Sequence, residues 1–507
     1  MVGQSYKEKA VSGVFWNFLF IVLSAPLGYL VRILYDRSIP LVDIGLFYAV
    51  LDLIAVFAII RELGLSYSLI HFIPKFLAMK RKELVKSTII IVALMQGIVG
   101  AAITLLTILF SRQIVVYYLS NKTAIPDIRL AIAVVIIGAI SSLIECFSSI
   151  SLHSILGFQK QKVFASYNIA KMSTVLAVSL AMVYFFKLKS AIVPSIAYLV
   201  MPILMLASYW LFFIKKVFPD FSRIKARISK KLSLEILRYA IPLALTSVGI
   251  IIMTSIDGIC LTYFSGLEQV GIYKNAVVST SNLLLYLASA VSTVLFPMIS
   301  ELWARKKFRE ISVGIEKTVS YSMIAVLPLS VFMAFFPTVI LNILWTSKNL
   351  VGANALRLLA IAAIFCTLFS IFSNFIRATG DSKTPMKILY AGAAFNLVGD
   401  IMIIPKMGMT GAAITTMLGY LLTAVLAYIY AKKKIEIQTD WKKIGIAAGG
   451  ALLSVTAIFL VKGIFSNLIL KLLVSAVAYF GTYLLIMFLT RTIDINEIKE
   501  AVLAVRK

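Results

Sequence analysis

Runs of about 20 apolar residues recur along the whole chain, and each run is long enough to cross the hydrocarbon core of a membrane as a helix. The segments between the runs are short and hold most of the charged residues. Hydrophobic residues make up 61% of the 507 positions, a share that excludes an ordinary soluble globular protein. The sequence therefore predicts an all-α integral membrane protein that passes through the membrane many times.

The lengths of the apolar runs predict about 14 membrane spans. The ninth span is the longest, and Pro328 and Pro337 are expected to kink it. The predicted spans cover residues 12–35, 42–61, 87–110, 129–152, 163–186, 190–214, 238–264, 270–296, 313–343, 354–377, 385–405, 409–431, 444–463 and 468–489.

The distribution of lysine and arginine predicts the topology. An even number of spans puts both termini on one side of the membrane, and the segments on that side hold 35 basic residues against 13 on the other side. Basic segments remain in the cytoplasm, so both termini are predicted to be cytoplasmic. The formal net charge of +27 is assigned to this topology and to anionic lipids, and no nucleic-acid partner is predicted, because the charges lie between apolar runs.

The sequence also indicates an internal repeat. Residues 32–50 align without a gap on 258–276, where Ile44-Gly45 meets Val270-Gly271, and 156–167 align on 379–390 at nearly the same shift. Six helices per copy give both copies the same orientation, so the repeat is parallel. The predicted parts are a six-helix lobe at 1–214, a cytoplasmic basic linker at 215–235, a second six-helix lobe at 236–434, and two further helices with a cytoplasmic tail at 435–507. Two such lobes are typical of transporters whose substrate binds between them.

Charged residues inside predicted spans are candidate site residues, because an ion in hydrocarbon costs several kcal/mol. Arg32 and Asp257 lie at similar depths in the two lobes, so we expect them to face each other or a shared cavity. Lys171, in the fifth span, is predicted to be a cavity cation. Arg61-Glu62 closes the second span, where Gly64 and a serine indicate a helix break that would expose Arg61 to a cavity.

Simpler interpretations of these residues remain open. Arg32 and Lys171 could extend to the membrane surface, and Arg61 could be a helix-end anchor. Three more acidic residues fall within spans, but the sequence does not rank them: Asp52, Glu145 and Asp400. The chain has no phosphate-binding loop, no HExxH and no cysteine–histidine metal spacing. We therefore predict no catalytic or metal site and no cofactor, and we do not expect an enzyme.

The order of motifs resembles that of polysaccharide-biosynthesis flippases. Residues 237–276 are similar to the family's mid-chain signature, with Pro242 early in a helix, Asp257 late in it, and V-G-x-Y after a turn. FPMISEL at 296–302 and FNLVGDIMIIPKMGMTGAAITTMLGY at 395–420 match later segments, and 30–50 and 61–73 match the opening. The chain is identified as a Wzx-type member of the MATE, oligosaccharidyl-lipid and polysaccharide exporter superfamily, also related to MurJ-type flippases. Asn17 and its apolar neighbours replace the arginines of MurJ-type members.

The resemblance implies two lobes in a V around a central cavity. It implies a flippase that moves polyprenyl-(pyro)phosphate-linked oligosaccharide to the outer leaflet of the plasma membrane by alternating access, for cell-surface polysaccharide or glycan assembly. Arg32 and Arg61 match its cavity cations, and Lys171 joins them in the predicted substrate site. Asp257 and Glu62 are predicted to link the lobes or to couple transport to H⁺ or Na⁺.

The implied partners are the lipid-linked oligosaccharide, membrane lipids, and glycan polymerase or ligase machinery. Two alternative functions remain. A MATE-like cation-coupled multidrug exporter would have an acidic, aromatic cavity, which Arg32 and Lys171 disfavour. An integral-membrane glycosyl-transfer enzyme is disfavoured by the short outer loops and by the repeat.

Overall fold

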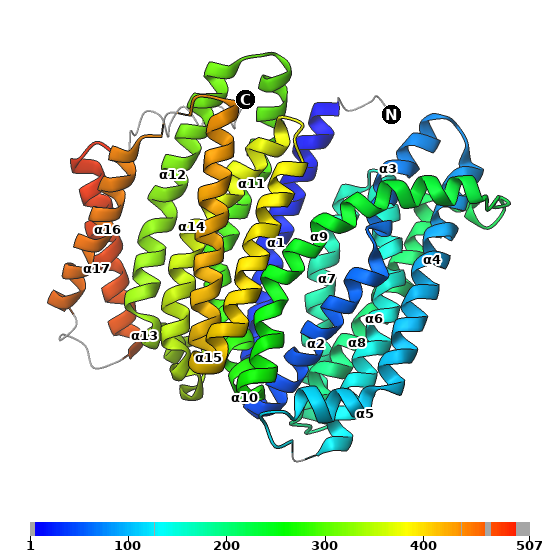
Figure 1. Cartoon of the computed structure of the whole chain (residues 1–507), viewed down its shortest axis with the longest axis horizontal. Coiled ribbons are helices and arrows are strands. Elements are labelled where there is room, and N and C mark those ends of the chain that lie inside the picture. Colours follow the sequence, from blue (N-terminus) through cyan, green and yellow to red (C-terminus); the bar gives the residue numbers. More distant parts are fainter. Residues whose placement is uncertain (1–5, 126, 438, 462–467, 493–507) are drawn as a thin grey trace. The chain divides into compact units, whose positions relative to one another are not determined.

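The computed structural model describes residues 6–125, 127–437, 439–461 and 468–492, and these residues form helices and short connections (Figure 1). The fold divides into two compact units. Unit 1 comprises Met1–Asn275 and Leu397–Ala412, and unit 2 comprises Ala276–Asn396 and Ala413–Lys507. Unit 1 thus includes helices that the sequence assigns to the second lobe, and the predicted lobe boundaries stay a prediction.

Unit 1 is built from long helices that pack side by side. α6 packs against α3, α4 and α8, and α1 packs against α7. π-helical turns follow α5, α7, α8 and α10, at Val115–Leu119, Ala181–Phe185, Phe213–Val217 and Ile272–Val277. The helices are α1 (Tyr6–Ser38), α2 (Leu41–Glu62), α3 (Leu65–Ala78), α4 (Lys82–Leu109), α5 (Ser111–Ile114), α6 (Ile128–Gly157), α7 (Gln161–Leu180), α8 (Ile192–Phe212), α9 (Lys230–Ser265) and α10 (Leu267–Gly271).

Two glycines let α2 and α10 pack at backbone distance. A Cβ at Gly45 would lie 1.8 Å from the carbonyl oxygen of Leu267, and a Cβ at Gly271 would lie 2.5 Å from that of Leu41. The repeat aligns Leu41 with Leu267 and Gly45 with Gly271, so each copy offers the same two residues to the other. Such reciprocity characterises surfaces related by a two-fold axis, and it supports the predicted parallel repeat.

Unit 2 contains α11 (Val278–Ala304), α12 (Phe308–Phe335), α13 (Pro337–Leu344), α14 (Ala353–Ala378), α15 (Lys383–Lys434) except for its part Leu397–Ala412, α16 (Trp441–Val461) and α17 (Leu468–Leu489). Pro328 has no backbone N–H, which leaves the carbonyl of Ile324 without its helical partner. The Tyr483 hydroxyl of α17 donates to that carbonyl at 2.8 Å. The helix α17 is thus attached to α12 at the site that the proline creates.

One predicted span needs correction. The ninth, 313–343, is not one kinked helix, because α12 ends at Phe335 and α13 begins at Pro337, a first-turn position where the missing N–H costs nothing. The predicted spans 385–405 and 409–431 agree with the structure, because the non-helical backbone of Gly408 (φ 54°, ψ −136°) divides α15 into two helical parts between them. A positive φ favours glycine there.

Eleven helices among the described residues are long and apolar enough to cross a membrane. The predicted multi-pass, all-helical class is confirmed. The count of about 14 spans stays a prediction, because the side chains of Asn17 and its neighbours in α1, and of residues 286–297 in α11, lie outside the described set.

Candidate functional site

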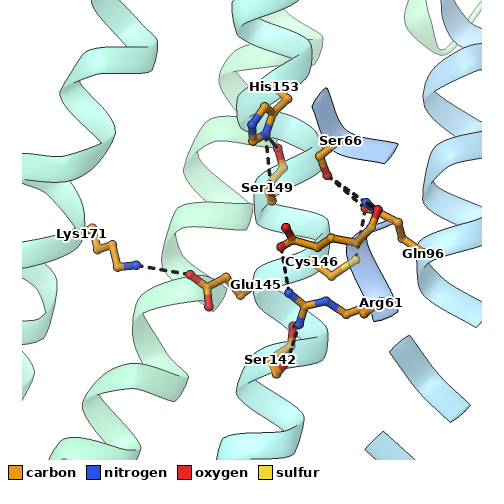
Figure 2. A network of polar contacts seen from close by, with 10 residues as sticks. Arg61, Ser66, Gln96, Ser142, Glu145, Cys146, Ser149, His153 and Lys171 are labelled. Carbon is orange, nitrogen blue, oxygen red and sulfur yellow. Dashed lines mark hydrogen bonds and ion pairs between the residues drawn. The ribbon is translucent and has the colours of Figure 1, made fainter. Parts of the chain in front are cut away.

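A polar network connects five helices in the interior of unit 1 (Figure 2). It begins at the last turn of α2, where the predicted helix break is present. Leu63 and Gly64 adopt left-handed backbone conformations (φ 40° and 69°), and α3 starts directly afterwards. The break ends α2 one residue after Arg61 and turns the chain back into the unit.

Arg61 lies inside unit 1, with a side chain only 5% exposed. Its guanidinium donates to both the carbonyl oxygen and the hydroxyl of Ser142 on α6. A second nitrogen, Nη2, lies 3.0 Å from Glu62 Oε1. This position differs from that of a surface anchor, because the charged group joins two helices in the interior.

Lys171 of α7 points toward α6 (Figure 2). Its ammonium lies 3.3 Å from Glu145 Oε1, and the two side chains are 23% and 41% exposed. Lys171 therefore lies in the interior, as predicted, but its carboxylate partner Glu145 was not predicted from the sequence. Only the packing of α6 against α7 brings the two residues together.

Gln96 of α4 bonds to the residues that flank Arg61 on α2 and α3. Its side-chain amide donates to the backbone carbonyl of Glu62 at 3.1 Å, and its amide oxygen accepts from the Ser66 hydroxyl at 3.2 Å. The Cys146 thiol lies 3.4 Å from the same oxygen. Because buried polar groups are costly without partners, these bonds hold α2, α3, α4 and α6 in a fixed register around Arg61.

Arg32 and Asp257 lie in a second cluster of unit 1. Arg32 Nη1 donates to the carbonyl oxygen of Lys274 at 2.8 Å, and its guanidinium lies 5.4 Å from the centre of the Tyr48 ring. Asp257 accepts a hydrogen bond from Tyr273 at 3.0 Å. Both residues thus contact the π-helical turn Ile272–Val277 at adjacent positions. Direct pairing of Arg32 with Asp257 stays a prediction.

A buried ion pair in this cluster was not predicted from the sequence. Lys274 Nζ lies 2.9 Å from Asp52 Oδ2, with side chains 9% and 12% exposed, and it donates to the Thr254 carbonyl at 3.0 Å. The prediction placed Lys274 at the outer start of the span 270–296 and counted it among the basic residues of the outer side. The repeat offered one sign of this pair, because it places the small residue Gly258 where the first copy has Arg32. A Cβ at Gly258 would lie 1.7 Å from Asp52 Oδ2, so glycine makes room for the pair.

Replacing Lys274 alone should lower the stability of the protein. We expect Lys274→Met to lower the free energy of unfolding by about 3–5 kcal/mol, because Asp52 loses its buried partner charge. The double variant Asp52→Asn/Lys274→Met should regain most of the loss. Denaturant unfolding of the purified protein in detergent measures both. Lys307→Met, which removes an exposed pair with Glu310, is the control and should cost less than about 1 kcal/mol. Equal losses in the single and double variants would refute a buried pair.

Comparisons with known proteins agree with this architecture. A family profile described as "Polysaccharide biosynthesis protein" matches residues 10–303, and one described as "MatE" matches 242–402. An uncharacterized membrane protein of Methanocaldococcus jannaschii, MJ1068, is 39% identical over 504 residues, which cover 98% of this chain and 99% of that protein.

Two further matches carry a functional name. The probable low-salt glycan biosynthesis flippase Agl15 of Haloferax volcanii is 24% identical over 205 residues, covering 40% of this chain and 42% of Agl15. A solved structure of the lipid II flippase MurJ, in an inward closed conformation, matches with a TM-score of 0.76 at 18% identity, covering 93% of this chain and 98% of that one. At this identity the structural match shows the shared fold.

Proposed function

Because the chain belongs to the polysaccharide biosynthesis protein family, we propose that it is a flippase for polyprenyl-(pyro)phosphate-linked oligosaccharide. The substrate would move from the cytoplasmic to the outer leaflet of the plasma membrane by alternating access, with both chain termini cytoplasmic. The delivered glycan would serve cell-surface polysaccharide or glycan assembly, with polymerase or ligase machinery as partners. The likeness to flippases and exporters supports transport over glycosyl transfer.

The observation that carries this proposal is the pair of interior cations in unit 1. Arg61 and Lys171 each face a carboxylate that is more exposed than the cation itself, Glu62 at 37% and Glu145 at 41%. Arginine and lysine form strong charge-assisted hydrogen bonds with phosphate oxygens. We propose that the phosphates of the lipid carrier replace these carboxylates as partners of the two cations. Arg32 is proposed as a third member of the substrate site.

This exchange suggests how transport is coupled. Arg61 and Lys171 together balance the charges of Glu62 and Glu145, so an entering phosphate would leave uncompensated negative charge in the unit. A proton or Na⁺ on a displaced carboxylate would restore the balance. We therefore propose Glu62 and Glu145 as coupling residues, with Asp257 as a further candidate for ion coupling or for contact between lobes.

Neutralising Glu145 tests the exchange. In Glu145→Gln the ammonium of Lys171 no longer has a carboxylate competitor, so we expect about tenfold tighter binding of the pyrophosphoryl head group, since a hydrogen bond to a charged group contributes about 1.5–3 kcal/mol. Transport should also lose much of its dependence on the ion gradient. Fluorescence polarisation measures the first effect and flux with and without a gradient the second. Glu310→Gln, on an exposed turn, is the control. Weaker binding in Glu145→Gln would contradict the exchange.

Proteoliposomes test the function itself. Fluorescent polyprenyl-pyrophosphoryl oligosaccharide in the inner leaflet should become accessible to a membrane-impermeant quencher only when the protein is present. The competing function, a MATE-like cation-coupled multidrug exporter, is favoured by the MatE match over 242–402. It predicts efflux of a fluorescent organic cation and no movement of the oligosaccharide. Formation or cleavage of glycosidic bonds by the purified protein would instead support the enzymatic alternative.

A further inference from the structure

An apolar groove of about 540 Å³ lies between α4, α6 and α8 in unit 1, outside the polar network. This volume lies within the range of roughly 300–1,000 Å³ that small-molecule sites occupy. Leu94, Gly97 and Ala101 of α4 form one wall, Phe147 of α6 forms the other, and Trp210 of α8 and Phe221 form one end. Since α4, α6 and α8 have the length and hydropathy of membrane spans, the groove lies at membrane depth.

Small residues along one face of α4 leave space for the groove. Ala93, Gly97 and Ala101 follow one another at intervals of four along α4, so they share a helix face. A Cβ at Gly97 would lie 3.1 Å from the Phe147 ring, which shows how closely α4 and α6 approach beneath the groove. A large side chain at this face would fill the groove.

Leu143 and Phe147 lie on the side of α6 opposite Glu145. At 100° per residue, positions two before and two after Glu145 project about 160° away from it. The groove is therefore separated from Lys171 and Glu145 by the body of α6. Arg61 lies closer to the groove, because a Cβ at Gly100 of α4 would lie 3.0 Å from Leu143 and 3.3 Å from the Arg61 side chain. The guanidinium of Arg61 donates to Ser142, which does not line the groove.

The groove ends at a basic segment of chain. Phe221 closes the 3₁₀ turn Pro219–Phe221, and its ring packs edge-on against Trp210 at 5.3 Å. Lys86 of α4 lies 4.9 Å from the Phe221 ring and donates to the Ile224 carbonyl at 2.7 Å. The Arg227 amide donates to Ser87 at 2.8 Å. The segment predicted as a basic surface linker is thus fixed to the start of α4.

Exposed positive charge gathers at this end. Arg223, Lys225 and Arg227 follow Phe221 within six residues, and their side chains are exposed. Lys86 is partly exposed beside the same ring. An apolar groove that ends at a cationic segment suits a ligand with an apolar chain attached to an anionic head group.

We propose that this groove binds one hydrocarbon chain of an anionic membrane phospholipid. The chain lies along Ala93, Gly97 and Ala101, and the phosphate contacts Arg223 and Lys225. Bound lipid would hold the linker segment against α4. The proposal concerns a lipid of the surrounding bilayer and does not depend on the proposed transport substrate.

Photo-crosslinking in proteoliposomes tests the site. The full-length protein is reconstituted in phosphatidylcholine vesicles that contain a trace of phosphatidylglycerol with a diazirine in its acyl chain. Peptide mapping should place the main adducts at 89–101 and 143–147. Ala101→Trp, which fills the groove, should remove most of this labelling. Ala102→Trp is the matched control, because Ala102 is also exposed on α4 but does not line the groove.

A second arm tests the head-group contact. Arg223→Gln/Lys225→Gln should lower groove labelling by phosphatidylglycerol about 25-fold, since each basic residue beside an anionic lipid contributes roughly fivefold to binding. Labelling by the phosphatidylcholine analogue should not change. Lys432→Gln/Lys433→Gln, an exposed pair at the end of α15, is the control. Even labelling of all apolar helices, unchanged labelling in Ala101→Trp, or equal labelling by both lipids would overturn the proposal.

Discussion

Replacing Arg61 by glutamine is expected to lower translocation of the lipid-linked oligosaccharide by at least about 100-fold. The guanidinium is 5% exposed and holds two groups of Ser142, so no water or mobile side chain substitutes for it. Its loss removes charge-assisted hydrogen bonds to phosphate and leaves part of a buried ionic network unpaired, an effect of about 3–5 kcal/mol. The quencher assay in proteoliposomes measures the rate.

Two further variants separate a role in binding from a role in folding. Arg61→Lys keeps the positive charge without the planar fork, so it should recover part of the rate. Arg377→Gln changes the same residue type near the end of α14 and should retain most activity. Melting temperatures identify variants that simply unfold. A well-folded Arg61→Gln protein with normal flux would remove Arg61 from the substrate site.

Replacing Gly45 by valine is expected to lower the free energy of unfolding by about 3 kcal/mol or more. The new Cβ would lie 1.8 Å from a backbone oxygen of Leu267, which cannot move aside as a side chain can. Gly271→Val should have a similar effect, because the two glycines occupy equivalent places in the reciprocal contact. Unfolding in detergent measures the change.

Gly449→Val provides the matched control for this contact. Gly449 also lies in a predicted span, and a Cβ there meets no other atom within 4 Å. This variant should unfold close to the wild type. If Gly45→Val and Gly449→Val have the same stability, α2 and α10 do not pack at backbone distance in the native protein.

The helical fold could be predicted because membrane spans depend mainly on the length and polarity of each segment. The helix breaks were harder to predict. The proline at 337 starts a new helix, which depends on Phe336 leaving helical geometry (φ −120°, ψ 37°). Leu63 adopts a positive φ of 40°, which its residue type does not favour, and the packing of Gly64 against the Ala240 backbone fixes the turn.

The candidate site was only partly predictable for the same reason. Charge in an apolar span identified Arg61 and Lys171 as candidates, but the carboxylate facing Lys171 depends on the rotation of α6. Lys274 follows the short helix α10, at the outer start of the predicted span 270–296, and was not singled out, although its ammonium lies 2.9 Å from Asp52. Local sequence carries no information on that approach, which requires α2 and α9 to meet at Gly258.

The structure therefore changes the proposed chemistry of the site. From the sequence, Arg61 and Lys171 were predicted as cavity cations that bind an anionic head group. The polar network of unit 1 instead holds two cation–carboxylate pairs, Arg61 with Glu62 and Lys171 with Glu145. We propose that such a site releases its carboxylates when it binds phosphate, and that this exchange links substrate binding to ion movement.

The charge of the lipid carrier gives the most direct test of this account. Flux is measured for one oligosaccharide on three polyprenyl carriers that differ only in the linkage: pyrophosphate, monophosphate and an uncharged ether. The account predicts that wild-type flux falls in that order, and that Arg61→Gln lowers flux on the charged carriers and removes most of the difference among the three. Equal wild-type flux on all three carriers, or faster flux on the uncharged one, would contradict the claim that the interior cations bind the phosphates.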